Sequence, residues 1–212
     1  SPDALALVPQ RVWNNMTQYL LAAIPLFIFM ASMLEKSGVI EEVFDVAYKW
    51  LGRIPGGLAV ATVVASTVLA AMVGVIGAAV VTMALVALPS MLRRGYSPVL
   101  AVGTVMAGGT LGILIPPSVL AIVYGLVANQ SVGELYLGSV FPGLVLSGLY
   151  ILFSVGYALL NPKAAPRLSP EEAPTWSERW RALRSIWSPL VLIFLVLGTI
   201  FLGLAAPTEA AA

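Results

Sequence analysis

The feature that most limits how this chain can fold is an uncharged stretch from Val99 to Val127, which glycines and prolines interrupt in the middle. Its centre, residues 108–118, reads Gly-Gly-Thr-Leu-Gly-Ile-Leu-Ile-Pro-Pro-Ser. A helix broken inside a bilayer leaves backbone N–H and C=O groups without intrahelical partners. Such groups are tolerated only against protein or along a cavity that holds water or a ligand. The pattern predicts a discontinuous helix over 99–127 that forms part of a transport site.

The composition places the chain among integral membrane proteins. Hydrophobic residues make up 59% of its 212 residues, charged residues make up 10%, and the mean hydropathy is +0.96. The net charge is only +1, and the basic residues form no continuous stripe, which argues against a nucleic-acid partner. The chain contains neither cysteine nor histidine, so it offers no disulfide, histidine metal site or histidine proton relay.

Enzymatic chemistry is not expected, and neither is a cofactor. The sequence lacks the Gly-x-x-x-x-Gly-Lys-Ser/Thr loop that binds nucleotide phosphates, and it has no nucleophile beside a base. The chain starts at Ser1 without an initiator Met and stops within Pro207–Ala212. We therefore treat residues 1–212 as a single membrane-domain fragment of a longer protein.

Runs without charge, separated by polar turns, predict an all-α polytopic bundle embedded in a lipid bilayer. Between them, residues 38–52 would form a helix with one apolar and one charged face, which is typical of a helix in the membrane interface. The expected elements are a span over 19–35, the interfacial helix over 38–52, spans over 135–160 and 187–206, and a loop over 161–186.

The run from Leu58 to Leu92 is too long for one crossing. As a single helix its 35 residues would measure about 52 Å, against a hydrocarbon core of about 30 Å. The glycines in Gly74-Val75-Ile76-Gly77 free the backbone for a turn and leave legs that are short for full spans. We therefore favour a re-entrant hairpin over 58–92, rather than two complete spans.

The distribution of Lys and Arg predicts the orientation. If 58–92 returns to its own side, ten of the eleven cations share one face and only Arg11 lies opposite, whereas one crossing would give eight to three. The positive-inside bias then makes loops 36–57, 93–98 and 161–186 cytoplasmic. The same count fits two full spans over 58–92, so it leaves that alternative open.

The membrane-embedded part lacks ionisable groups. No acid or base lies between Arg53 and Arg93, or between Arg94 and Glu134, so a bound cation would need carbonyl and hydroxyl oxygens, which suit Na⁺. A half-helix that restarts near Ser118 could face an anionic substrate. The candidate site residues are Gly74, Gly77, Ala78, Thr82, Gly108, Gly109, Thr110, Gly112, Ile115, Pro116, Pro117 and Ser118, of which Gly74, Thr82, Gly112 and Ser118 are the predicted Na⁺ ligands.

Structural explanations compete with these assignments. Small residues such as Gly108 and Gly112 commonly just allow close helix packing, and a proline pair can produce a plain kink. The hydroxyl of Thr82 can bond back to its own helix. The tryptophans of 176–187 share one helical face, which is more typical of an interfacial belt than of a ligand cage.

An ordered set of motifs resembles the large membrane subunit, DctM type, of the tripartite ATP-independent periplasmic (TRAP) transporters. The most specific motif is Gly-x-Leu-Ile-Pro-Pro-Ser, within 108–118. The other matching stretches are Ile24-Pro25-Leu26-Phe27, residues 34–38, the hairpin residues 74–89, Arg94-Gly95-Tyr96, Tyr124-Gly125, Phe141-Pro142-Gly143 and Pro207-Thr208-Glu209-Ala210.

This resemblance implies a sodium-driven symporter in a bacterial inner membrane, with an elevator motion and small organic acids as substrates. A DctP-type periplasmic binding protein would deliver the substrate, and a DctQ-type small membrane subunit would support the chain. The hairpin and broken helix would be the first half of an inverted repeat. One departure matters: many relatives carry Gly-Ser-Ser at the hairpin tip, where this chain has Gly74-Val75-Ile76.

Two other functions fit the same sequence. The first is a stand-alone ion-coupled anion carrier of the related hairpin-containing transporters, which would need no binding protein. The second is a membrane scaffold that transports nothing and whose glycines only pack helices. It predicts no thermal shift with Na⁺ and candidate acids.

Overall fold

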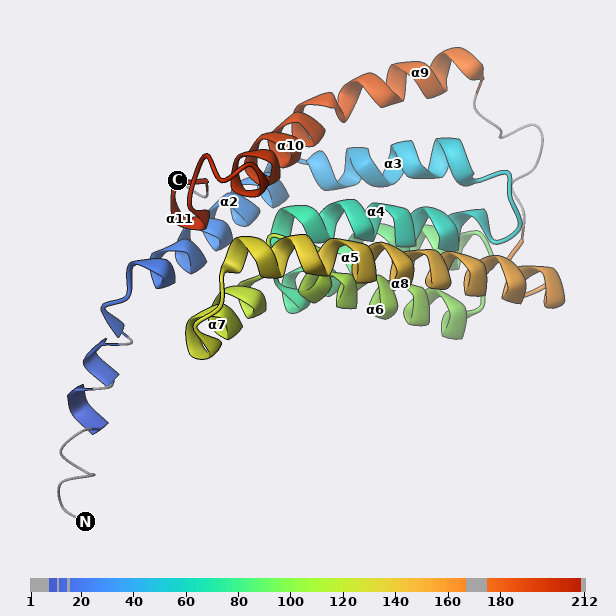
Figure 1. Cartoon of the computed structure of the whole chain (residues 1–212). Coiled ribbons are helices and arrows are strands. Elements are labelled where there is room, and N and C mark those ends of the chain that lie inside the picture. The colour runs from blue at the N-terminus through green and yellow to red at the C-terminus, as the bar shows by residue number, and fades with distance from the viewer. Residues whose placement is uncertain (1–7, 11, 15, 167–174, 211–212) are drawn as a thin grey trace.

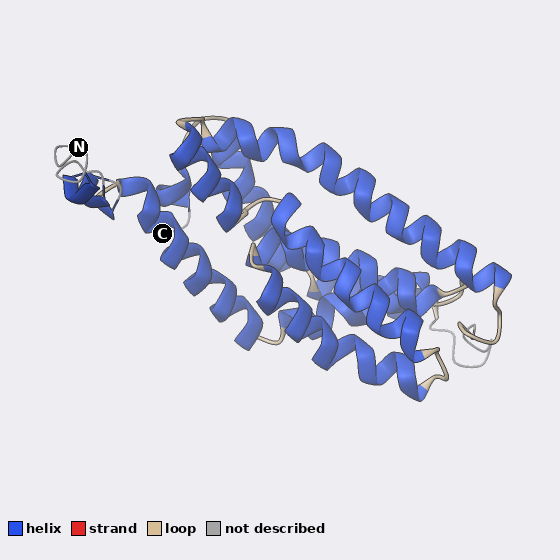
Figure 2. Ribbon diagram, turned by 90° about the horizontal axis from the view of Figure 1, so that it is seen from below, coloured by secondary structure: helices blue, strands red, loops and turns tan. Residues whose placement is uncertain are grey.

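The computed structural model describes residues 8–10, 12–14, 16–166 and 175–210, and its elements there are all helices (Figures 1 and 2). The expected all-α class is confirmed. The helices from residue 19 onward are η1 Tyr19–Ala22, α2 Ala23–Lys36, α3 Val39–Leu51, α4 Gly57–Val73, α5 Ile76–Arg93, α6 Pro98–Leu114, α7 Val119–Ala128, α8 Val132–Leu160, α9 Trp176–Ser185, α10 Trp187–Phe201 and α11 Pro207–Ala210.

Several helical segments are long and apolar enough to cross a membrane, which confirms the polytopic class. Within the described residues there are four, or five if the bent pair α9 and α10 is one span. The four are Tyr19–Lys36, Ile76–Arg93, Pro98–Ala128 and Val132–Leu160. Helix α4 is apolar throughout but has only 17 residues. Whether α4 and α5 cross the bilayer or return within it stays a prediction.

Helix α4 forms the centre of the bundle. Its apolar side chains are buried on nearly every side, with Ala59, Ala61 and Val63 completely enclosed. Helices α2, α3, α5, α6 and α8 contact it. A helix that is hydrophobic all round is expected in the interior rather than at a surface.

Helix α3, expected in the interface over 38–52, begins after Gly38, which adopts φ +77°. It runs alongside α4 (Figure 1) and packs its apolar face, which includes Ile40, Val43 and Phe44, into the same core. Its acidic residues Glu41 and Glu42 are exposed. The amphipathic pattern thus serves packing within this chain.

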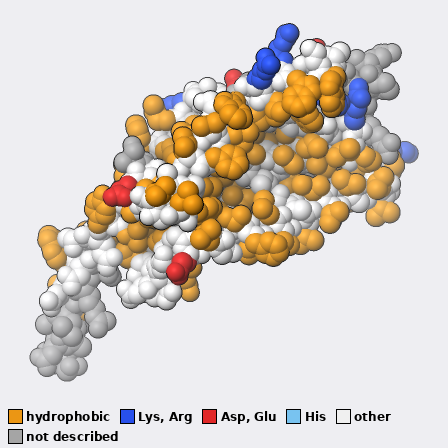
Figure 3. Space-filling model, turned by 45° about the horizontal axis from the view of Figure 1, so that its top comes forward, with side chains coloured by type: hydrophobic (Ala, Val, Ile, Leu, Met, Phe, Trp, Pro, Cys, Tyr) orange, Lys and Arg blue, Asp and Glu red, His pale blue; other side chains and the backbone are white. Residues whose placement is uncertain are grey.

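Three turns meet at one end of the bundle. The N–H of Ser97 donates to the carbonyl of Ala164 at 2.9 Å, and the N–H of Leu58 donates to the Tyr96 hydroxyl at 3.2 Å. Burial raises the pKa of that tyrosine, so it stays protonated. These contacts bring the ends of α5 and α8 to the start of α4. In Figure 3 the visible Lys and Arg side chains lie mainly along the upper edge and right end, while hydrophobic side chains cover the body.

The range 161–186, expected as a loop, contains helix α9. Thr175 and Glu178 form a capping box at its start, with the Thr175 N–H donating to the Glu178 carboxylate at 2.7 Å. The rings of Trp176 and Trp180 each lie 5.8 Å from the ring of Trp50 on α3. Two of the tryptophans on the predicted face therefore pack against the bundle.

Candidate functional site

The hairpin tip and the break in the discontinuous helix touch each other. Helix α4 ends at Val73, Gly74 has φ +64°, and α5 begins at Ile76. The N–H of Val119, the first residue of α7, donates to the carbonyl of Gly74 at 3.3 Å. A Cβ added to Gly74 would lie 2.2 Å from the carbonyl oxygen of Pro117. Two interruptions far apart in sequence thus form one junction, which we call the break junction.

Local chemistry explains why the chain breaks here. Glycine adopts the left-handed conformation of residue 74 without a steric penalty from a Cβ. Pro116 and Pro117, joined by a cis peptide bond, have no backbone N–H to continue the hydrogen bonding of α6. Ser118 then caps α7, because its Oγ accepts from the N–H of Ala121 at 3.4 Å.

Four helix ends converge at the break junction. The carboxyl ends of α4 and α6 supply carbonyls without intrahelical partners, and the amino ends of α5 and α7 supply N–H groups. The first set carries partial negative charge and the second partial positive charge. The arrangement can therefore coordinate a small cation with carbonyls and face an anion with N–H groups.

The two amino ends differ in openness. Ser118 is 1% exposed, and the α7 donors of Val119 and Ala121 already have partners. Helix α5 has no side-chain cap, and Gly77 in its first turn is exposed. The start of α5 is thus more accessible to an anion than the start of α7, where the sequence predicts it.

Part of the predicted set lies at the break junction. A Cβ on Gly112 would lie 3.7 Å from the carbonyl carbon of Val75, so this glycine faces the hairpin tip. The side chains of Ile115, Pro116 and Pro117 are buried beside it. The predicted residues found here are Gly74, Gly77, Ala78, Gly112, Ile115, Pro116, Pro117 and Ser118.

Gly108 and Gly109 lie instead where α6 crosses the hairpin legs. A Cβ on Gly108 would be 2.4 Å from Ser66 Oγ on α4, and one on Gly109 would be 2.1 Å from a methyl of Val80 on α5. These glycines allow α6 to approach both helices closely. Their position fits the packing explanation.

Two predicted hydroxyls bond elsewhere. Thr82 donates to the carboxylate of Glu35 on α2 at 2.8 Å. Thr110 donates to the carbonyl of Ala107 at 2.7 Å and lies 3.2 Å from the hydroxyl of Tyr150 on α8. Of the hydroxyls named from the sequence, Ser118 is the one that the fold brings to the break junction.

Two residues near the site were missed by the sequence reasoning. Glu35 was expected only as the end of a span, yet with Ser32 it lines a small cavity of about 110 Å³ beside the hairpin residues Val75 and Ala78. Tyr136 is fully buried and donates its hydroxyl to the carbonyl of Ser118 at 3.3 Å. Neither contact leaves a local pattern, because each joins helices that are distant in sequence.

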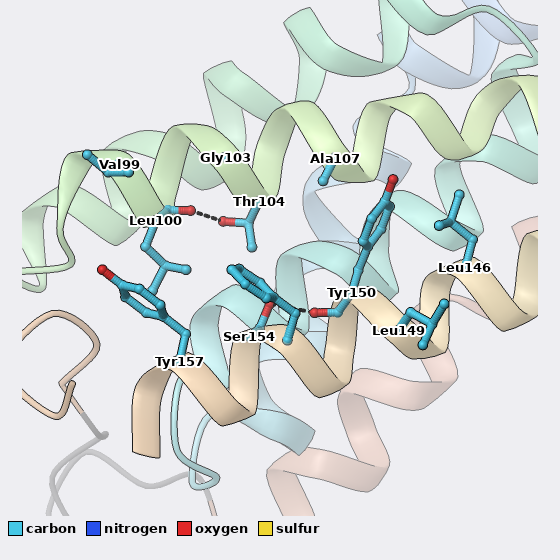
Figure 4. Close-up of a pocket in the computed structure, with 11 residues that line it drawn as sticks. Val99, Leu100, Gly103, Thr104, Ala107, Leu146, Leu149, Tyr150, Ser154 and Tyr157 are labelled. Carbon is cyan, nitrogen blue, oxygen red and sulfur yellow. Dashed lines mark hydrogen bonds between the residues drawn. The ribbon is translucent and has the colours of Figure 1, made fainter. Parts of the chain in front are cut away.

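A larger cavity of about 590 Å³ runs between α6 and α8 (Figure 4). Its eleven described lining residues carry no charge. The hydroxyl of Thr104 donates to its own helix at Leu100, and that of Ser154 donates to Tyr150 in the same way. This cavity suits apolar groups rather than an organic anion.

Comparison with known proteins identifies the family. The model of the DctM component of the tripartite ATP-independent periplasmic transporters matches residues 2–212. The chain belongs to the DctM family. The resemblance inferred from its motifs is therefore confirmed.

Three curated relatives of this DctM-family chain are similar to it along most of its length. The C4-dicarboxylate TRAP transporter large permease protein of Vibrio cholerae is 38% identical over 100% of the chain and 46% of the relative. Its counterpart in Pseudomonas aeruginosa is 37% identical, over 100% and 48%. The ectoine TRAP transporter large permease protein of Halomonas elongata is 32% identical, over 91% and 44%. The chain thus spans about half the length of these relatives.

Proposed function

We propose that this chain is part of the permease subunit of a sodium-coupled secondary transporter that imports a small organic anion. The observation that carries the proposal is the contact between the hairpin tip at Gly74 and the restart of the broken helix at Val119, in a chain of the DctM family. Paired helix interruptions supply the carbonyls and N–H groups that ions and substrates need inside a membrane. The chain itself carries out no enzymatic chemistry in this proposal.

Sodium binds, in this proposal, to oxygens at the carboxyl ends of α4 and α6. Gly74 and Gly112 lie at or beside these ends, and Ser118 closes the break junction. Carbonyl oxygens at interrupted helices replace the hydration shell of the ion without an intramembrane carboxylate. Thr82 would join them only by releasing Glu35, to which it donates in this structure.

The anionic substrate approaches the open amino end of α5, at Gly77 and Ala78. Unpaired N–H groups and the helix dipole favour negative charge there. The relatives named above are described as transporters of C4-dicarboxylates and of ectoine, both of which carry a carboxylate. An organic acid is accordingly the proposed substrate class.

The working assembly includes a DctP-type periplasmic binding protein that delivers the substrate and a DctQ-type small membrane subunit. Family membership supports both, since the matching family is described as one component of a tripartite system. The assembly lies in a bacterial inner membrane, with loops 36–57, 93–98 and 161–186 on the cytoplasmic side. Substrate crosses by an elevator motion of the part that contains the break junction.

Uptake into proteoliposomes tests the proposal. The full-length protein, its small partner and its binding protein should together accumulate a labelled C4-dicarboxylate only when an inward sodium gradient is present. Uptake that persists without sodium would refute the coupling. Uptake without the binding protein would favour the stand-alone carrier.

Variants at the break locate the site. Pro117→Ala and Ser118→Ala should reduce uptake strongly while leaving assembly with the small subunit intact. Thr199→Ala, which removes a hydroxyl that bonds within α10 at Leu195, is the matched control and should transport normally. If all three variants take up substrate equally well, the break is only a kink in the helix and not part of the transport site.

A further inference from the structure

The exposed face of α9 and the start of α10 carry two adjoining hollows. One, of about 390 Å³, is lined by Ser177, Trp180, Arg181 and Arg184. The other, of about 450 Å³, is lined by Trp180, Leu183, Arg184 and Trp187. Trp180 and Arg184 line both, so the hollows are neighbours. We propose that they bind one anionic phospholipid, with its phosphate in the first hollow and an acyl chain in the second.

The first hollow has the donors that a phosphate requires. Ser177, Arg181 and Arg184 follow one another at i, i+4 and i+7, which places them on one helical face. Guanidinium groups present paired N–H donors that match phosphate oxygens, and a hydroxyl adds another donor. Within the described residues neither arginine forms a salt bridge. Both side chains are exposed, and Arg181 also interacts electrostatically with the carboxylate of Glu178, whose pKa it helps to lower.

The second hollow has the apolar surface that an acyl chain requires. The side chains of Trp180 and Trp187 are 50% and 70% exposed, and Leu183 lies between them. Tryptophan is enriched at the membrane interface, where its ring meets the lipid between headgroup and chain. Exposed aromatic rings beside a hydrophobic helix are thus suited to hold lipid rather than water.

The orientation of the two hollows matches that of a lipid. Helix α9 is polar, and α10 has no charged residue. The axes of the two helices differ by 46°, so the chain bends where the polar segment meets the apolar one (Figure 1). The phosphate hollow lies on the polar side of this bend, and the apolar hollow reaches past it to Trp187. A free phosphate would fill only the first hollow, whereas a phospholipid fills both.

Native mass spectrometry of the detergent-solubilised full-length protein tests the site. We expect it to retain added dioleoyl phosphatidylglycerol in preference to dioleoyl phosphatidylcholine. Each lost cation should weaken retention of phosphatidylglycerol about fivefold, so Arg181→Gln with Arg184→Gln should weaken it about 25-fold. Trp187→Ala should weaken the retention of both lipids to the same extent. Arg93→Gln, which removes an exposed cation elsewhere, is the matched control and should bind like the wild type.

Several results would overturn the proposal. These are equal retention of the two lipids, an unchanged affinity in the double variant, or the same loss in Arg93→Gln. Competition by inorganic phosphate alone at equal concentration would indicate a phosphate site instead. Slower hydrogen exchange of α9 with the small subunit, and not with phosphatidylglycerol, would assign the face to a protein. If the double variant fails to fold, Arg181→Gln and Arg184→Gln are measured singly; each should weaken retention of phosphatidylglycerol about fivefold, and unchanged retention in both would overturn the proposal.

Discussion

Replacing Gly74 with alanine should damage the protein far more than the same change three residues later. Gly74 has φ +64°, a conformation that costs a residue with a Cβ about 1–2 kcal/mol. The new methyl would also lie 2.2 Å from the carbonyl oxygen of Pro117, a backbone atom that cannot rotate away. Overpacking of this kind costs about 1–3 kcal/mol. Together the two effects come to about 2–5 kcal/mol.

Gly77→Ala is the matched control, because it makes the same chemical change at the other tip glycine. No atom lies within 4 Å of a Cβ at Gly77, and its backbone is helical. Alanine is a better helix former than glycine by about 0.8–1 kcal/mol, so this variant should be neutral or slightly stabilised.

Thermal unfolding of the purified full-length protein measures both effects. Gly74→Ala should unfold several degrees below the wild type, and Gly77→Ala at or slightly above it. Hydrogen exchange in Gly74→Ala should become faster at the carboxyl end of α4 and at the amino end of α7, since the hydrogen bond from Val119 to Gly74 would weaken. If the two variants unfold at the same temperature, the close contact between the hairpin tip and Pro117 does not exist in the protein.

Two further predictions concern hydrogen bonds outside the break junction. The separate variants Thr82→Val and Glu35→Gln should leave the sodium dependence of uptake unchanged, because the Thr82 hydroxyl is hydrogen-bonded to Glu35. A lower apparent sodium affinity in Thr82→Val alone would show that Thr82 is an ion ligand. Thr175→Ala should destabilise α9 by about 1 kcal/mol and speed its hydrogen exchange. Hydrogen bonds from Thr175 lower the pKa of Glu178 below its ordinary value of 4.5. The contribution of the Glu178 carboxylate to the stability of α9 is therefore complete at neutral pH and is lost as the pH falls through that lowered pKa. Hydrogen exchange of α9 that does not change with acid would contradict this.

The sequence supplied much of the information about where helices stop. Glycine at position 74 and the prolines at 116 and 117 act on their own backbone, so their effect can be read without knowing the fold. The capping pair Thr175 and Glu178 likewise signals the start of a helix within the range expected to be a loop.

The contents of the site could be foreseen only in part. Gly112 and Ser118 reach the break junction because they lie at the break itself. Thr82 and Thr110 lie on regular helix, where the side-chain direction depends on how the helix is rotated against its neighbours. One faces Glu35 and the other Tyr150. Residue type alone carries no information about that rotation.

The amino-acid sequence by itself determined the membrane class, the family and the positions of the two helix breaks. The membrane class follows from composition and the breaks from backbone chemistry within a few residues, whereas the family follows from the ordered set of motifs. Only the tertiary structure decided that Gly74 contacts Pro117 and Val119, and that Tyr136 on α8 donates a hydrogen bond to Ser118 in the break. Such contacts join residues that are distant in sequence. They depend on the packing of α4, α6 and α8 as a whole, which no local pattern encodes.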